Sequence, residues 1–140
     1  MDTAQVEQWF ATYLDEFAAL GRGDVDDVGR MLAHYGVPLI LSSDAGCLVL
    51  ADESQVRAAA QQQIDGLRAA DYDRSEVLAA ETTVLNQSCA MHHGSFARLR
   101  ADGSELSRLD ATYLITDTPA GRRISVIVLH TASSGAALPD

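Results

Sequence analysis

The sequence has few cysteines and no long hydrophobic run. Its two cysteines, Cys47 and Cys89, lie far apart and match no CxxC or Cys/His spacing that binds a metal. No apolar stretch approaches the roughly 18 residues of a membrane-spanning helix, and no cationic leader precedes the first amphipathic segment. We therefore expect a cytoplasmic protein with reduced thiols, without a disulfide and without membrane contact.

Positively charged residues are also scarce. Ten Lys and Arg oppose 20 Asp and Glu, which gives the chain a formal net charge of −10. Such an acidic surface repels phosphate groups, which argues against nucleic acids and anionic membranes as partners. The glycine-rich loops that hold nucleotide phosphates, GxGxxG and GxxxxGKS/T, are absent as well. The sequence therefore predicts a protein that uses no cofactor.

The first half of the chain shows the 3.6-residue periodicity of amphipathic helices. A first helix is expected to end at Gly21 and Gly23, because glycine tolerates the left-handed conformation that follows a helix. A second is expected from the capping residue Asp24 until just before Pro38, and a third over about residues 53–70. Their apolar positions are Val6, Phe10, Tyr13, Leu14, Phe17 and Leu20, then Val25, Val28, Met31, Leu32 and Tyr35, then Val56, Ala60, Ile64 and Leu67.

The periodicity changes to two residues, typical of strands, in the second half. Two earlier apolar runs, Leu39–Ser42 and Cys47–Leu50, flank a glycine-containing turn and predict a β-hairpin. Four longer strands are expected at residues 76–87, 90–100, 106–116 and 124–131. The turn sequences Asp102-Gly103 and Pro119-Ala120-Gly121 join the last three of these strands.

Helices gathered on one side of an antiparallel sheet make an α+β domain. We expect one domain over residues 1–131, followed by a flexible tail over residues 132–140. Apolar side chains occupy both faces of the last strand, on one side Ile124, Val126 and Val128, on the other Ile127 and Leu129. The helices can cover one face only, and soluble monomers rarely expose so large an apolar patch. The sequence therefore predicts a homodimer paired through the outer, convex face of the sheet.

Short motifs mark the ends of several expected elements. They are Leu20-Gly21-Arg22-Gly23-Asp24, Val28, Met31-Leu32-Ala33-His34-Tyr35, Phe96-Ala97-Arg98-Leu99-Arg100, Asp102-Gly103-Ser104-Glu105, Tyr113 and Gly121-Arg122-Arg123-Ile124. Over roughly residues 6–130 this arrangement resembles the nuclear transport factor 2-like superfamily, which includes ketosteroid isomerase-like and polyketide cyclase-like proteins. Arg122 stands where many members have a tryptophan.

The resemblance implies three N-terminal helices packed on a curved antiparallel sheet, which forms a cone around a central pocket. The open end of the cone holds a small, often apolar, molecule, and members are commonly homodimers. The superfamily contains isomerases, cyclases, dehydratases, epoxide hydrolases and proteins without catalysis. Function must therefore be argued from the site and not from the fold.

The carboxylate base of the isomerase-type members has no counterpart in this chain. Its position falls on Ile40, and an aliphatic side chain cannot abstract a proton. A shifted alignment would reach Asp44, but this residue is more typical of a turn. The oxyanion-donating tyrosine of the first helix corresponds to Glu16, while Tyr13 lies nearly one turn earlier on the apolar face.

The turn Asp102-Gly103 predicts which side chains share a sheet face. A two-residue turn places His92 opposite Tyr113, with Phe96 on the same face, whereas a slip of one residue would exchange the two faces and turn His93 towards the pocket. Tyr113 falls near the position where the isomerases keep a neutral acid beside the oxyanion. A phenol could take that role, with His92 as a base or second donor. The alternative is that His92 and Tyr113 form a structural pair in the core.

The opposite face of the same strands carries a second polar set. It consists of His93, Ser95, Asp110 and His130. A catalytic triad is not expected there, because no GxSxG elbow holds the serine and no helix N-terminus supplies oxyanion donors. A polar patch at the dimer interface is favoured instead. Since His92 and His93 are neighbours on one strand, they point to opposite faces and cannot bind one metal ion, and we expect no metal site.

The sequence thus predicts a small-molecule-binding protein with an apolar, cone-shaped pocket for a hydrophobic molecule. The expected lining residues are Phe10, Tyr13, Tyr35, Phe96 and Tyr113. The alternative is a cofactor-independent isomerase, cyclase or dehydratase that acts on a hydrophobic carbonyl compound through Tyr113 and His92. The missing carboxylate at Ile40 favours binding, whereas the His92/Tyr113 pairing keeps the enzyme alternative open.

Overall fold

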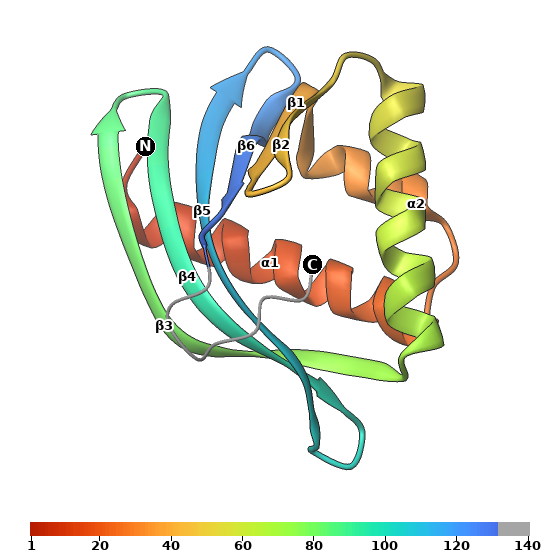
Figure 1. Ribbon diagram of the computed structural model, residues 1–140. Helices are drawn as coiled ribbons and strands as arrows, with labels where there is room; N and C mark the ends of the chain where they lie inside the picture. The colour runs from red at the N-terminus through yellow and green to blue at the C-terminus, as the bar shows by residue number, and fades with distance from the viewer. Residues whose placement is uncertain (132–140) are drawn as a thin grey trace.

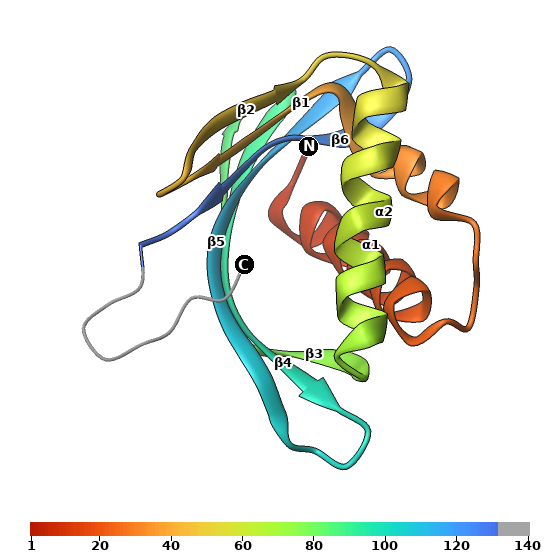
Figure 2. The same ribbon diagram turned by 45° about the vertical axis from the view of Figure 1, so that its right-hand side comes forward.

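Six strands form one curved sheet whose concave side faces the helices (Figure 1). The computed structural model describes residues 1–131, so the expected tail lies outside the described residues. The elements are α1 (Thr3–Arg22), the 3-10 helix η1 (Val28–Ala33), β1 (Tyr35–Ser43), β2 (Gly46–Leu50), α2 (Glu53–Ala69), β3 (Tyr72–Asn86), β4 (Cys89–Arg100), β5 (Glu105–Thr118) and β6 (Gly121–Leu129). In Figure 2, α1 and α2 lie on the concave side, and no described element covers the convex side. The α+β class is confirmed.

The strand order is β2-β1-β6-β5-β4-β3. Neighbouring strands are antiparallel, except that β1 and β6 run parallel and thereby attach the first hairpin to the end of the sheet. The predicted pairing of His92 with Tyr113 and of Phe96 with Leu109 is confirmed. The two-residue turn from which it was predicted was wrong, because the Arg100 N–H donates to the Ser104 carbonyl across a three-residue loop, and a register shift between Arg98 and Leu99 compensates for the extra residue. The residues on the concave face were therefore predicted correctly for these two strands.

Local capping explains why both long helices begin and end where they do. The Asp2 carboxylate accepts a hydrogen bond from the Gln5 backbone N–H at the start of α1. Gly23 ends this helix with a φ of 87°, a conformation that a side chain would disfavour. At the start of α2, Asp52 accepts the equivalent bond from Gln55. The first and third predicted helices are thus confirmed, along with their buried stripes.

The prediction of a second α-helix from Asp24 was wrong. The segment forms only the six-residue η1, capped by Asp27, and Tyr35 already belongs to β1. Tyr35 pairs with Ile124 of β6, and the Ile124 N–H donates to the His34 carbonyl. Tertiary pairing therefore converts the end of the expected helix into a strand, which a short apolar run permits equally well.

The prediction for the faces of the last strand was wrong at Ile124. Leu114 pairs with Val126 but Ile115 with Ile124, so Ser125 is an extra residue, a β-bulge. The bulge shifts the alternation, and Ile124 becomes fully buried in the concave core. Ile127 and Leu129 pack on that same core.

The outer face keeps an apolar row in spite of this bulge. The register aligns five side chains across the sheet, from Val49 through Ile40, Val126 and Leu114 to Met91. Val49 and Met91 are exposed at the two ends of the row. None of the helices in the described part of the chain is long and apolar enough to span a membrane, and both cysteines are free thiols.

Candidate functional site

A cavity of about 70 Å³ lies between the helices and the concave face of the sheet. Its wall takes side chains from two helices and five strands. They are Tyr13, Leu14 and Phe17 of α1, Tyr35 of β1, Gln63 of α2, Ser75 of β3, Phe96 and Arg98 of β4, Leu109 and Tyr113 of β5, and Ile127 and Leu129 of β6. The wall combines the aliphatic side chains of Leu14, Leu109, Ile127 and Leu129 with three phenols and one guanidinium group.

Three tyrosines meet at the wall of the cavity. The hydroxyl groups of Tyr13 and Tyr35 lie 3.0 Å apart and share a hydrogen bond. The ring of Tyr113 lies edge-on to that of Tyr13, with 6.3 Å between their centroids. Burial raises the pKa of Tyr13, of Tyr35 and of Tyr113 above the ordinary phenol value, so all three stay neutral and able to donate hydrogen bonds.

Arg98 brings a positive charge to the same wall. Its side chain follows Phe96 on the concave face of β4, and the residue is only 6% exposed. The guanidinium carbon lies 5.8 Å from the centre of the Phe17 ring, within the range of a cation–π contact. Among residues 1–131, Arg98 forms no ion pair and no side-chain hydrogen bond. A buried charge is costly when nothing compensates it, so this group is suited to an anion in the cavity.

The wall of the cavity holds no base that could accept a proton. None of its described residues is an aspartate, glutamate or histidine. The tyrosines are poor bases because burial favours their neutral form, and arginine is always protonated. The arrangement can therefore hold and stabilise negative charge, but it does not supply a group for proton abstraction.

The sequence matches a family described as NTF2-like protein (DUF6841) over residues 3–132. The chain belongs to this NTF2-like family. No curated protein matches the sequence. The family membership agrees with the resemblance inferred from the motifs.

Solved structures of other proteins share the fold of this NTF2-like protein. A domain of unknown function with a cystatin-like fold from Nostoc punctiforme has a TM-score of 0.68 and 15% identity, covering 96% of this chain and 82% of that one. A nuclear transport factor 2-like superfamily protein from Salmonella enterica has a TM-score of 0.62 and 15% identity, covering 99% and 100%. An NTF2-like protein with a cystatin-like fold from Novosphingobium aromaticivorans has a TM-score of 0.62 and 16% identity, covering 94% and 83%. These identities establish a common fold alone.

The cavity of this NTF2-like protein contains four of the five predicted lining residues. Tyr13, Tyr35, Phe96 and Tyr113 belong to its wall. Phe10 does not. It lies deeper in the core, 4.8 Å from Tyr113 between ring centroids.

His92, predicted as a base or second donor, is also absent from the cavity wall. Its ring stacks against Phe10 with 4.1 Å between centroids, and its Nδ1 lies 2.7 Å from the Thr82 hydroxyl. The ring centroids of His92 and Tyr113 are 6.3 Å apart. These contacts satisfy His92 within the core, and Tyr113 alone of the predicted catalytic pair reaches the cavity.

The positions aligned with the isomerase machinery supply no substitute. Ile40 pairs with Val126 on the outer face, away from the cavity. Asp44 lies in the β1–β2 turn, as expected, and accepts a hydrogen bond from Thr131. Glu16 forms an ion pair of 3.0 Å with Arg30. The steroid isomerase mechanism therefore has no base in this site.

Arg98 was not predicted as a site residue. Its position carried the signal, because Arg98 follows Phe96 by two residues on one strand, and residues two apart share a face. Gln63 and Ser75 were also missed, since each comes from an element whose facing depends on the tertiary packing of α2 and β3.

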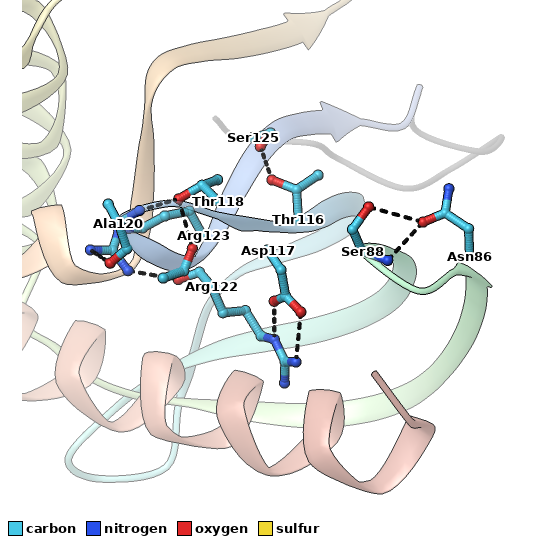
Figure 3. Close-up of polar contacts among 10 residues, drawn as sticks. Asn86, Ser88, Thr116, Asp117, Thr118, Ala120, Arg122, Arg123 and Ser125 are labelled. Carbon is cyan, nitrogen blue, oxygen red and sulfur yellow. Dashed lines mark hydrogen bonds and ion pairs between the residues drawn. The ribbon is translucent and has the colours of Figure 1, made fainter.

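Arg122, at the position where the resemblance implies a tryptophan in many members, bridges the two strands of the β5–β6 hairpin. Its guanidinium donates to both carboxylate oxygens of Asp117, at 2.7 and 3.2 Å (Figure 3). The same view shows the Thr116 and Ser125 hydroxyls in contact at the bulge. These bonds hold β5 and β6 together near the turn, and further along β6 Ile127 and Leu129 belong to the cavity wall.

Proposed function

We propose that this NTF2-like protein binds a small organic molecule that carries a negatively charged group, such as a carboxylate or an enolate. The observation that carries the proposal is Arg98, a buried cation in a cavity wall without an ion-pair partner in the described chain. Guanidinium groups bind carboxylates through two parallel hydrogen bonds, and the phenols of Tyr13 and Tyr113 provide further donors. The ligand would place its charged end among these three groups.

The cavity dimensions support a compact ligand. An apolar cavity of about 150 Å³ holds benzene, so a space of about 70 Å³ fits a smaller molecule or one end of a larger one. The aliphatic side chains of Leu109, Ile127 and Leu129 would contact the apolar part. The proposed ligand therefore differs from the hydrophobic molecule expected from the sequence, because it also carries a charged group at one end.

The alternative function is a cofactor-independent isomerase, cyclase or dehydratase that acts on a carbonyl compound. One observation favours it, since neutral phenols beside a guanidinium would stabilise a developing oxyanion. The absence of a carboxylate or imidazole from the described wall argues against proton transfer by the protein. Binding without catalysis is therefore the function that the geometry supports best.

The proposal predicts that charge, and not shape, decides binding. Propionate and propionamide have nearly the same shape, but only the first is an anion. At constant ionic strength we expect propionate to raise the thermal unfolding midpoint of the full chain and propionamide to leave it unchanged. Arg98→Met, which keeps the length and apolar stem, should abolish the difference, while the exposed outer-face residue Arg108→Met serves as the matched control.

Equal effects of propionate on the wild type and on Arg98→Met, or equal effects of propionate and propionamide, would contradict the proposal. A native mass spectrum of the purified protein adds an independent measurement. A retained ligand detected in negative-ion mode after denaturation supports an anion. A retained neutral hydrocarbon would favour the purely apolar pocket instead.

We further propose that the protein acts as a cytoplasmic homodimer paired through the convex face. The apolar row from Val49 to Met91 supports this, because it crosses five strands on the side that the helices leave open. A two-fold axis on this row would bury the same patch on both copies. Stable interfaces bury about 1,600 Å² in total, which is about what one sheet face offers.

A further inference from the structure

A second polar group lies on the face of the sheet opposite the cavity. It consists of His93 of β4, Asp110 of β5 and His130, the residue after β6. The register brings these residues together, since Asp110 pairs with Ser95 and its carbonyl accepts a hydrogen bond from the His130 N–H. In the single chain their side chains are 35–46% exposed. They share the convex face with the apolar row of the proposed dimer, so a metal ion here would lie within or beside that interface. We refer to His93, Asp110 and His130 as the outer triad.

The ligand atoms of the outer triad already converge. One nitrogen or oxygen from each residue lies within 4.8 Å of the other two. The His93 Nε2 is 2.6 Å from one carboxylate oxygen of Asp110, and the His130 Nδ1 is 3.8 Å from the other. The two imidazole rings stack with 4.8 Å between centroids and 8° between planes. Both rings therefore direct a nitrogen towards the same carboxylate.

Neighbouring hydroxyl groups hold two of these side chains in place. The Thr112 hydroxyl lies 2.7 Å from the His130 Nε2, and the Ser95 hydroxyl donates to Asp110 at 3.1 Å. With its Nε2 engaged by Thr112, His130 has its Nδ1 facing Asp110. Metal-binding histidines typically use their second ring nitrogen in this way, which fixes the tautomer and the ring orientation.

We propose that the outer triad binds a divalent first-row transition-metal ion through two imidazoles and one carboxylate. Imidazole and carboxylate suit ions such as Zn²⁺, and three protein ligands leave a position open for water. Zinc–ligand bonds of about 2.0–2.1 Å put tetrahedral ligand atoms about 3.3 Å apart. The distances of 2.6 Å and 3.8 Å from Asp110 oxygens to the two histidine nitrogens lie on either side of this spacing. The proposal replaces the expectation of no metal site, which rested on His92 and His93 alone.

The experiment is a calorimetric titration of the chelator-treated full chain with ZnCl₂, with both thiols alkylated beforehand. We expect one Zn²⁺ per chain. His93→Ala and His130→Ala should each weaken binding at least tenfold, and Thr112→Val should weaken it about tenfold without removing a ligand. Asp110→Asn should also weaken binding at least tenfold, and its matched control is Asp102→Asn, which removes a carboxylate from the β4–β5 turn and should leave binding unchanged.

Spectroscopy of the Co²⁺-substituted protein identifies the ligands independently. Nitrogen and oxygen ligands at the outer triad should give visible d–d bands that His93→Ala removes while the circular dichroism spectrum keeps its folded shape. The proposal is overturned if Zn²⁺ does not bind, or if it binds equally well to His93→Ala and His130→Ala. Thiolate charge-transfer bands in the protein with free Cys47 and Cys89, which disappear on alkylation together with all binding, would overturn it as well.

Discussion

The chemical properties of its guanidinium group explain why Arg98 can be buried beside aromatic rings. It is planar and weakly hydrated, so it stacks on Phe17 at a lower desolvation cost than an ammonium group would. Its charge also reaches the phenols, where it works against the effect of burial on the pKa of Tyr13, Tyr35 and Tyr113. A lysine at this position would lack the planar fork on which two-point binding of a carboxylate depends.

His92 makes stability depend on pH at the scale of a single residue. Burial lowers its pKa below the ordinary value of 6.5, so the unfolded chain binds more protons once the pH falls below about 6.5. The free energy of unfolding should therefore decrease from pH 7.5 to pH 5. His92→Asn keeps a group that can bond Thr82 but cannot titrate. Urea denaturation at both pH values should show a smaller decrease for the variant than for the wild type.

His34 acts in the same direction, because burial lowers its pKa too, but it is present in both proteins and cancels in the comparison. A pH dependence as large in His92→Asn as in the wild type would show that His92 does not contribute. The chosen range stays above the carboxylate titrations, which lower stability only in stronger acid.

At the scale of elements, local chemistry predicted most boundaries and tertiary contacts decided the rest. The end of α1 at Gly23 and the turn at Asp102-Gly103 depend on a few neighbouring residues, so the sequence alone predicted them. The segment at Tyr35 became a strand because β6 pairs with it from the far end of the chain. The bulge at Ser125 left no local signal, since its neighbours are all compatible with a regular strand.

Two helical glycines offer a matched test of packing against helix propensity. A Cβ on Gly21 of α1 would lie 2.6 Å from the ring of Tyr72, which is buried and bonded to Ser75. Gly66 of α2 has open space around it. We expect Gly21→Ala to lower the free energy of unfolding by about 1–3 kcal/mol. Gly66→Ala should raise it by about 0.5–1 kcal/mol, as alanine favours helix.

Urea unfolding of both variants measures the two effects against the same wild type. If Gly21→Ala were as stabilising as Gly66→Ala, α1 and β3 would not pack as closely as the structure has them. Circular dichroism at 222 nm confirms that each variant keeps its helices.

At the scale of the whole molecule, the candidate site was predictable in its apolar part and not in its charge. Tyr13 follows from helical spacing, and Phe96 and Tyr113 from strand alternation. Arg98 obeys the same alternation, but a charged residue is ordinarily exposed, and its burial depends on the curvature that brings α1 over β4. The sequence did place His93, Asp110 and His130 on one face of three paired strands, but the expectation of no metal site compared only His92 with His93.

The proposed homodimer is tested by charges on opposite faces of one edge strand. Val49 and Leu48 of β2 are 55% and 54% exposed, but Val49 belongs to the outer apolar row and Leu48 pairs with Leu41 on the other face. Sedimentation at tens of micromolar should show a dimer of about twice the 15.0 kDa chain. Val49→Asp should shift it towards the monomer and Leu48→Asp should not. Val126→Asp, in the middle of the row, should have the larger effect.

A wild-type particle of about 15 kDa at that concentration would refute the pairing. Dissociation by Leu48→Asp but not by Val49→Asp would mean that the dimer pairs through the face that carries Leu48, and would contradict pairing through the convex face. From the sequence alone, either Val126 or Ile127 could point to the convex face. In the structure Ile127 contributes to the cavity wall on the concave face, so Val126 is the residue on the convex face.

Arg98 is a buried cation within a chain whose net charge is −10, and this contrast has a kinetic consequence for the anion we propose. At long range the molecule repels such a ligand, and attraction begins only where Arg98 and the phenols are close. Association of the ligand is then slow, and its dissociation is slow as well. Dissolved salt screens the outer repulsion over a distance of about 10 Å at 0.1 M but penetrates the cavity far less. Entry should therefore quicken as ionic strength rises, the reverse of ordinary electrostatic steering.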